Sequence, residues 1–186
     1  MRERKPNRLT DYDYSQNGYY FVTLCAKDKR EFFGSIAEGK MDLNKYGEIV
    51  NRCWYELPVH YLNCSSDAFV VMPNHLHGII VINNEDAVGN GLKPFPTHGL
   101  SEIMRGFKTF SSRRINEIKD FDKFQWQKSF YDHIVRDEES LRRIREYICF
   151  NPLKWEMDIE NRNSHFPHEN CADYYEGIIT GGQKKR

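Results

Sequence analysis

The chain has 186 residues, of which 39% are hydrophobic and 29% are charged. This length suits one compact domain that buries its own core, and the composition is that of a globular protein. No apolar run approaches the ~20 residues that a membrane span requires. The first ten residues are basic and no apolar stretch follows them, so they are not a secretory signal. The five cysteines include no CxxC pair, which predicts reduced thiols and a cytoplasmic location.

The formal net charge is zero, but the basic residues are unevenly distributed. Residues 1–10 carry four basic and one acidic side chain, and residues 101–154 carry twelve basic and nine acidic ones. Residues 155–180 carry one basic and six acidic side chains. The two basic segments are compatible with a local phosphate-binding face, although ordinary solvated helix surfaces explain them equally well.

The first half of the chain predicts three strands and one helix. Aromatic and β-branched residues at 19–25 favour a strand, and 27–34 would be its turn. Apolar residues spaced three and four apart between Tyr46 and Leu57 predict an amphipathic helix. Strands at 67–72 and 76–82 are separated by a Pro-Asn turn signal, so they would pair as a hairpin.

The second half begins with a segment, 83–98, whose Asn, Gly and Pro content predicts a mobile loop. A helix follows from Ser101, then a strand at 130–135, then a helix capped by Asp137 with two glutamates in its first turn. The order is βαββαβ with one extra helix, which predicts an α+β fold, a ferredoxin-like sandwich with an antiparallel sheet and an additional C-terminal catalytic helix.

Two histidines with one residue between them, His75 and His77, mark the second strand of the predicted hairpin. Alternate residues of a strand point to the same face, so the two imidazoles would lie side by side while Leu76 points away. Such a pair suits a divalent cation with open coordination positions, which polarises a phosphate oxygen. The spacing alone is more often that of two surface or core histidines.

A second pattern lies on the last predicted helix, where Arg143, Tyr147 and Asn151 are spaced by four and share one stripe. A phenol with a pKa near ~10 attacks well at neutral pH only beside a cation. The amide oxygen of Asn151 is a suitable hard ligand one turn later. A half-buried structural tyrosine is the alternative for Tyr147, and spacing does not exclude it.

Taken together, these segments resemble the single-tyrosine HUH transposases, and most closely the REP-associated tyrosine transposases. The resemblance rests on Met72-Pro73-Asn74-His75-Leu76-His77 followed by Tyr147-Ile148-Cys149-Phe150-Asn151-Pro152. Trp126 to His133 and Arg136-Asp137-Glu138 also match, in the same order. The likeness covers residues 19–155, which would form the transposase domain between a basic N-terminal arm (1–18) and a polar C-terminal tail (156–186).

This resemblance implies a DNA transposase that cleaves and rejoins single-stranded or hairpin DNA at repeat ends. Tyr147 would form a 5′-phosphotyrosine, while His75, His77 and Asn151 would hold Mg²⁺ or Mn²⁺. Members of the family occur as monomers and as homodimers that exchange the tyrosine helix. Two alternatives stay open at this point: a DNA-binding module of the same fold that does not cleave, and a replication-type nickase.

Further residues are candidates for DNA contacts. Basic side chains along the second helix would meet phosphates, although each is equally well explained as a solvated charge. His133 and two arginines near the tyrosine would line the site. The candidates are Arg105, Lys108, Arg113, Arg114, His133, Arg136 and Arg143.

Overall fold

The computed structural model describes residues 12–85, 97–119, 123–164 and 171–182. Most of the predicted N-terminal arm, the centre of the predicted loop after Asn83, and residues 165–170 and 183–186 of the predicted tail lie outside the described residues. In chain order the elements are β1 (Gly18–Cys25), the 3-10 helix η1 (Lys27–Lys29), β2 (Gly34–Ala37), β3 (Lys40–Leu43), α1 (Lys45–Tyr55), α2 (Leu57–His60), β4 (Cys64–Val71), β5 (His75–Ile82), α3 (Leu100–Glu117), β6 (Tyr131–Val135), α4 (Glu138–Phe150), the 3-10 helix η2 (Pro152–Met157) and α5 (Cys171–Thr180).

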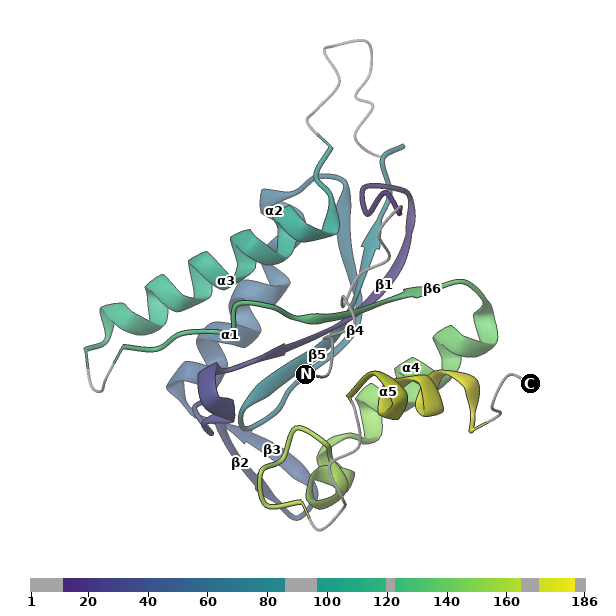
Figure 1. Ribbon diagram of the computed structural model, residues 1–186. Coiled ribbons are helices and arrows are strands. Elements are labelled where there is room, and N and C mark those ends of the chain that lie inside the picture. Colours follow the sequence, from purple (N-terminus) through teal and green to yellow (C-terminus); the bar gives the residue numbers. More distant parts are fainter. Residues whose placement is uncertain (1–11, 86–96, 120–122, 165–170, 183–186) are drawn as a thin grey trace, which may run out of the picture.

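Within the described residues, one four-stranded sheet forms the centre of the molecule, in the order β4-β5-β1-β6 (Figure 1). All neighbouring strands are antiparallel. The central strands β1 and β5 pair along their whole length, with Gly18 opposite Ile82 and Cys25 opposite His75. This order, with α1 and α3 in the connections, is the ferredoxin-like arrangement, so the predicted fold class is confirmed.

The two faces of the sheet are covered by different helices (Figure 1). Tyr20, Val22 and Leu24 on β1 belong to the larger apolar core with α1 and α3. Phe21 belongs instead to a second core, with residues of α4 and α5. The alternation follows from the two-residue period of a strand. The additional helix of the prediction therefore covers the face that the ferredoxin-like helices leave open.

Gly78 shows how closely the larger core is packed. A Cβ atom at this position of β5 would lie 2.3 Å from an edge carbon of the Trp54 ring. Trp54 is fully buried, and its indole nitrogen donates a hydrogen bond to the Ser66 hydroxyl at 2.7 Å. A glycine is therefore required where α1 presses its largest side chain against the strand.

The β2–β3 hairpin and the helix α5 are among the elements that were not expected from the sequence. The hairpin of β2 and β3 pairs only four residues on each strand and lies outside the main sheet, so its periodic signal is short. The helix α5 falls within the predicted polar tail. By contrast, the predicted cap of α4 is confirmed, because the Asp137 carboxylate accepts a hydrogen bond from the Ser140 backbone nitrogen at 2.8 Å. None of the described helices is long and apolar enough to cross a membrane.

Candidate active site

The two histidines lie at the start of β5, on the face of the sheet that α4 covers. Both imidazoles are fully buried, and their Nε2 atoms are 2.9 Å apart. Leu76, between them, is buried in the core of the opposite face. The prediction that His75 and His77 share one face is confirmed.

Asn74 fixes the ring of His75. Its amide nitrogen donates to the carbonyl oxygens of Lys29 and Glu160, at 3.2 and 2.9 Å. The amide oxygen is therefore the atom that lies 2.7 Å from His75 Nδ1. The hydrogen-bond network thus assigns a hydrogen to Nδ1, so that His75 Nε2 presents a lone pair towards His77.

Thr23, on the neighbouring strand, supports the second ring through a contact of 2.8 Å between its hydroxyl and His77 Nδ1. In this network His77 Nε2 is assigned the hydrogen that faces His75 Nε2, and the Thr23 hydroxyl donates to Nδ1. A hydroxyl also accepts hydrogen bonds, so the same contact holds His77 after its hydrogen moves to Nδ1. Both Nε2 lone pairs then face the same point, which is the arrangement that metal-ligating histidines adopt.

Tyr147 lies directly over this pair, in the same chain. Its hydroxyl is 3.0 Å from His77 Nε2 and donates a hydrogen bond to Asp158 Oδ2 at 3.1 Å. The ring packs edge-on against Phe21 of β1, with centroids 6.2 Å apart. Helix α4 therefore presents one tyrosine to the histidines and fixes its ring by aromatic packing.

Asp158 closes the site from the segment after η2. Its Oδ2 atom accepts a hydrogen bond from the Asn151 amide at 2.7 Å and lies 3.8 Å from His77 Nε2. Its Oδ1 atom accepts a hydrogen bond from the Glu160 backbone nitrogen at 2.6 Å. The carboxylate is buried, so it brings one negative charge into contact with the phenol and the imidazoles.

Burial and this charge shape the protonation of the site. Burial, together with the neighbouring His77, lowers the pKa of His75 to about 3, so the ring is neutral at neutral pH. Burial also raises the pKa of Tyr147 well above 10, and the charge of Asp158 acts in the same direction. For Asp158, burial raises the pKa, but the neighbouring His77 and His75 and the hydrogen bond donated by Asn151 outweigh it, so its pKa lies well below the usual value.

The donor atoms fit a divalent cation. One ligand atom each from His75, His77 and Asp158 lies within 4.8 Å of the others, and all three residues are buried. The Oδ1 atom of Asn151 is also buried and has no hydrogen-bond partner among the described residues. Two imidazole nitrogens with one or two oxygens make a mixed set that suits Mn²⁺ or Mg²⁺.

Glu160 holds the segment that carries Asp158 against the sheet. Its buried carboxylate lies 2.9 Å from Lys29 Nζ and accepts hydrogen bonds from the Tyr175 hydroxyl at 3.2 Å and the Cys25 thiol at 3.3 Å. These contacts connect residues 158–160 to β1, the turn after it and α5. The acidic segment is thus part of the core rather than a solvated tail.

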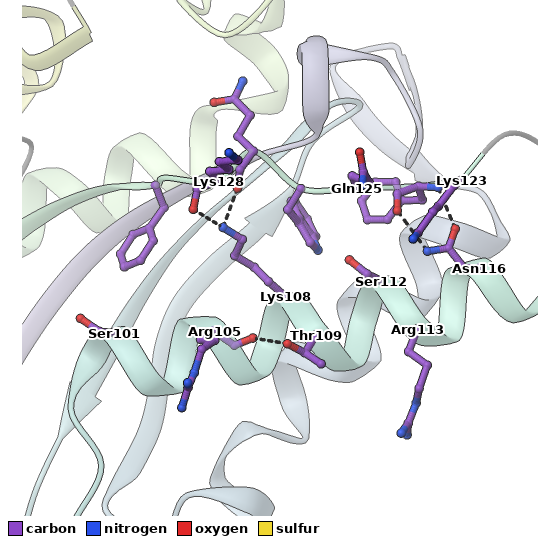
Figure 2. A pocket seen from close by; sticks show the side chains of 14 residues that line it. Ser101, Arg105, Lys108, Thr109, Ser112, Arg113, Asn116, Lys123, Gln125 and Lys128 are labelled. Atoms are coloured by element: carbon purple, nitrogen blue, oxygen red, sulfur yellow. Dashed lines mark hydrogen bonds between the residues drawn. The ribbon is translucent and has the colours of Figure 1, made fainter. Parts of the chain in front are cut away.

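The candidate DNA contacts on α3 do not form one group. Arg105, Lys108 and Arg113 line a groove between α3 and residues 123–130 (Figure 2). Arg114 points instead towards α1, where its guanidinium lies 2.5 Å from a carboxylate oxygen of Glu56. Helix α3 covers the face of the sheet opposite to the histidines, so none of these cations adjoins the metal-site residues.

The three candidate DNA contacts near Tyr147 also lie apart from one another. His133 lies on β6 opposite Phe21, two residues along β1 from Thr23, the register partner of His77. Arg143 forms an ion pair with Glu139 at 2.9 Å and donates to the Ile179 carbonyl of α5. Arg136 is exposed just after β6.

Asp158 is the site residue that sequence reasoning missed. It lies eleven positions after Tyr147, beyond the end of α4, within a segment of weak periodicity. A signal was present in the alternation of Asp158, Ile159 and Glu160, where an apolar residue separates two acidic ones. Acidic residues in a polar segment are normally solvated, however, so this pattern alone does not indicate a site.

Comparison with known proteins agrees with this geometry. The family model of IS200-like transposases matches residues 14–151, and the chain belongs to this family. The match includes His75, His77, Tyr147 and Asn151 but ends before Asp158. The resemblance inferred from the sequence motifs is therefore confirmed.

Two relatives come from Haemophilus influenzae. An uncharacterised protein is 40% identical over 172 residues, covering 85% of this chain and 93% of the relative. A protein named for the REP-associated tyrosine transposases is 22% identical over 143 residues, covering 76% and 74%. Among solved structures, a REP-associated tyrosine transposase bound to a REP hairpin is 20% identical, with a TM-score of 0.54 over 79% of this chain and 74% of that one. This last likeness concerns the fold.

Proposed function

We propose that this transposase cleaves and rejoins single-stranded or hairpin DNA through a covalent bond between Tyr147 and a 5′-phosphate. The observation that carries the proposal is the contact of 3.0 Å between the Tyr147 hydroxyl and His77 Nε2, inside a buried group of metal-ligating side chains. A tyrosine that served packing alone needs no such neighbours. A module that only binds DNA needs no buried ligand set, which weighs against the non-cleaving alternative.

In the cleavage step, the Tyr147 oxygen attacks the phosphorus, and the bond from phosphorus to the 3′ oxygen breaks. Over the whole step the phenol loses its proton and the leaving 3′ oxygen gains one, while Asp158 accepts the hydroxyl hydrogen bond at 3.1 Å and so orients Tyr147 for the attack. The products are a 5′-phosphotyrosine and a free 3′-hydroxyl. Rejoining is the reverse attack by a 3′-hydroxyl, and it needs no ATP because the phosphotyrosine retains the bond energy.

His75 and His77 would hold the divalent ion through their Nε2 atoms. Asn151 offers the oxygen ligand predicted from the sequence, and Asp158 offers a further one. The bound ion, Mg²⁺ or Mn²⁺, would stabilise the charge that develops on the phosphate oxygens and on the phenolate. Because burial raises the pKa of Tyr147, the phenol stays protonated until that charge compensation is present.

The proposed form of the DNA substrate is based on the solved relative, which is bound to a REP hairpin. By likeness of family and fold we propose hairpin or single-stranded DNA as the substrate, at repeat ends. The contact of Tyr147 with histidines of its own chain supports an active site formed within one chain, either in a monomer or in a homodimer that does not exchange α4. Free thiols at Cys25, Cys53, Cys64 and Cys149 accord with the proposed cytoplasmic location.

The proposal is tested by incubating the protein with labelled hairpin-bearing single strands and Mn²⁺ and separating the products under denaturing conditions. We expect a protein–DNA adduct that disappears in the Tyr147→Phe variant and persists in Tyr55→Phe, a matched loss of one hydroxyl at an exposed residue of α1. An adduct that survives Tyr147→Phe would overturn the assignment of the nucleophile, and the lack of any adduct on all strands would overturn the cleavage chemistry.

The oxygen ligand is tested separately by Mn²⁺ titration of the free protein. If Asp158 binds the ion, Asp158→Ala weakens Mn²⁺ binding more than Asn151→Ala does, because the first variant removes an oxygen ligand together with its charge. The opposite ranking would assign Asn151 as the ligand and leave Asp158 with the hydrogen bond to the phenol.

A further inference from the structure

The groove between α3 and residues 123–130 is a second charged feature, on the side of the sheet away from Tyr147 (Figure 2). Its volume is about 670 Å³. Five basic side chains line it, and none of the described residues in its lining is acidic. The five are Arg105, Lys108, Arg113, Lys123 and Lys128. The groove is therefore a site for an anionic ligand, and the cations come from two walls that are distant in sequence.

One wall is α3. Lys108 points from it towards the second wall, whereas Arg105 and Arg113 extend from its outer side and form the rim, as Figure 2 shows. From Arg105 to Arg113 the helix axis advances by about 12 Å at ~1.5 Å per residue. Phosphates of one DNA strand repeat every ~3.4 Å in a duplex and further apart when the strand is extended. The cations thus span several phosphates of a strand. One ion of the size of a phosphate would be too small to contact all of these cations.

Lys108 ties the two walls together at the floor of the groove. Its ammonium donates hydrogen bonds to the carbonyl oxygens of Gln127 and Lys128, at 2.5 and 2.8 Å, as Figure 2 shows. The guanidinium groups of Arg105 and Arg113 are largely exposed and form only long contacts with carboxylates, 3.9 Å to Glu102 and 3.8 Å to Glu117. Exposed pairs of this kind contribute little, so both arginines are available to phosphates.

The second wall continues the edge of the sheet next to the metal site. Gln127 donates a backbone hydrogen bond to the Cys25 carbonyl at 2.9 Å, and Cys25 is the register partner of His75. Neighbouring strands lie ~4.8 Å apart, so the wall is about 10 Å from the backbone of His75 across β1. A strand that leaves the groove around this edge therefore arrives at the face where Tyr147 lies.

We propose that this groove binds the sugar–phosphate backbone of single-stranded DNA that extends from the cleavage site. A single strand fits because its flexible backbone can follow cations that lie on the second wall and on the rim of α3. Phe130, half-buried in the lining, adds an aromatic surface of the kind on which unpaired bases stack. The inference rests on the proposed function for the identity of the polyanion, but its test does not require cleavage.

The test uses the full chain in a Tyr147→Phe background, so that binding is measured without covalent capture. Lys123→Gln with Lys128→Gln removes two wall cations, and Arg105→Gln with Arg113→Gln removes two rim cations. Lys40→Gln with Arg52→Gln is the matched control, because both residues are exposed on elements outside the groove. Lys108 is left intact because it holds the walls together.

Binding of a labelled thymidine oligonucleotide is followed by fluorescence anisotropy over a range of salt concentrations. Each lost phosphate contact lowers the slope of log K against log salt by ~0.7 for single strands, so affinity falls roughly 5-fold per contact at about 0.1 M salt. Each double variant should therefore bind roughly 25-fold more weakly than the control. Binding of a blunt hairpin without a single-stranded flank should change no more than in the control.

Two results would overturn the inference. One is single-strand binding by both double variants that equals that of the control, and the other is a loss confined to the blunt hairpin. Neither result bears on the cleavage chemistry, because adduct formation is measured separately, with the chain that retains Tyr147. Conversely, if no DNA forms an adduct while the double variants still lose single-strand binding, the cleavage chemistry fails and the groove stands.

Discussion

The two faces of the central sheet are built from the same strands and are used in opposite ways. On one face, alternate residues of β1 and β5 pack with α1 and α3 into an apolar core. On the other, Thr23, His75 and His77 lie under α4 in a buried polar group. Residues next to each other in sequence thus serve packing and chemistry respectively. The difference teaches that burial alone does not mark an apolar core, since His75 and His77 are as fully buried as Leu76 between them.

The largest effect is expected from a substitution at His77, on the polar face of the sheet. His77→Ala removes one of two imidazole ligands, and we expect metal-dependent adduct formation to fall by ~10³-fold or more, because one ligand of the ion and a neighbour of the phenol are lost together. The free energy of unfolding should change far less than the activity. Adduct assays and chemical denaturation of the same preparation measure the two effects. Adduct formation within ten-fold of the parent protein would contradict the metal assignment.

The neighbouring residue tests the opposite face. Leu76→Ala leaves a cavity in the apolar core, and we expect a loss of roughly 2–5 kcal/mol in the free energy of unfolding, as for other buried leucines. Metal affinity at temperatures where the variant stays folded should be close to that of the parent. Urea denaturation and Mn²⁺ titration are the measurements. A variant as stable as the parent would show that the larger core does not carry the stability of the fold.

Thr23 lies on β1. One face of this strand packs in the larger apolar core, and on the other face the Thr23 hydroxyl supports His77. Thr23→Val keeps the shape of the side chain and removes the hydroxyl that contacts His77 Nδ1 at 2.8 Å. Loss of such a partner lowers metal affinity by roughly 10–100-fold. Thr23→Ser retains the hydroxyl and should restore affinity. If Val and Ser behave alike in Mn²⁺ titrations, the hydroxyl has no role in orienting the ring.

The smallest effect concerns pH. Burial lowers the pKa of His133 to about 4, and the charge of Arg136 acts in the same direction. Between pH ~6.5 and ~4 the unfolded chain binds a proton that the folded chain does not, so His133 makes the protein less stable as the pH falls through this window. At pH ~5.5 the cost is about 1.4 kcal/mol. His133→Gln should lose this part of the pH dependence in denaturation curves measured at pH 5.5 and 7.5, while the part due to His75 remains. An unchanged pH dependence in the variant would contradict the shift.

Sequence alone determined the features that depend on local periodicity. The two-residue period of β5 places both histidines on one face, and the helical period of α4 places Tyr147 and Asn151 one turn apart. The strand order and the extra helix followed from the sequence of element types, and the motifs around these residues indicated the family.

The tertiary structure alone decided which distant residues meet. Tyr147 contacts His77 across 70 positions, Asp158 enters the site from a segment without a periodic signal, and Arg114 turns towards Glu56 and away from its neighbours on α3. Such contacts depend on how helices pack on the two faces of the sheet, and packing leaves no spacing rule in the sequence. The physical reason is that local backbone geometry sets the direction of a side chain, whereas its partner is set by the elements that bury it.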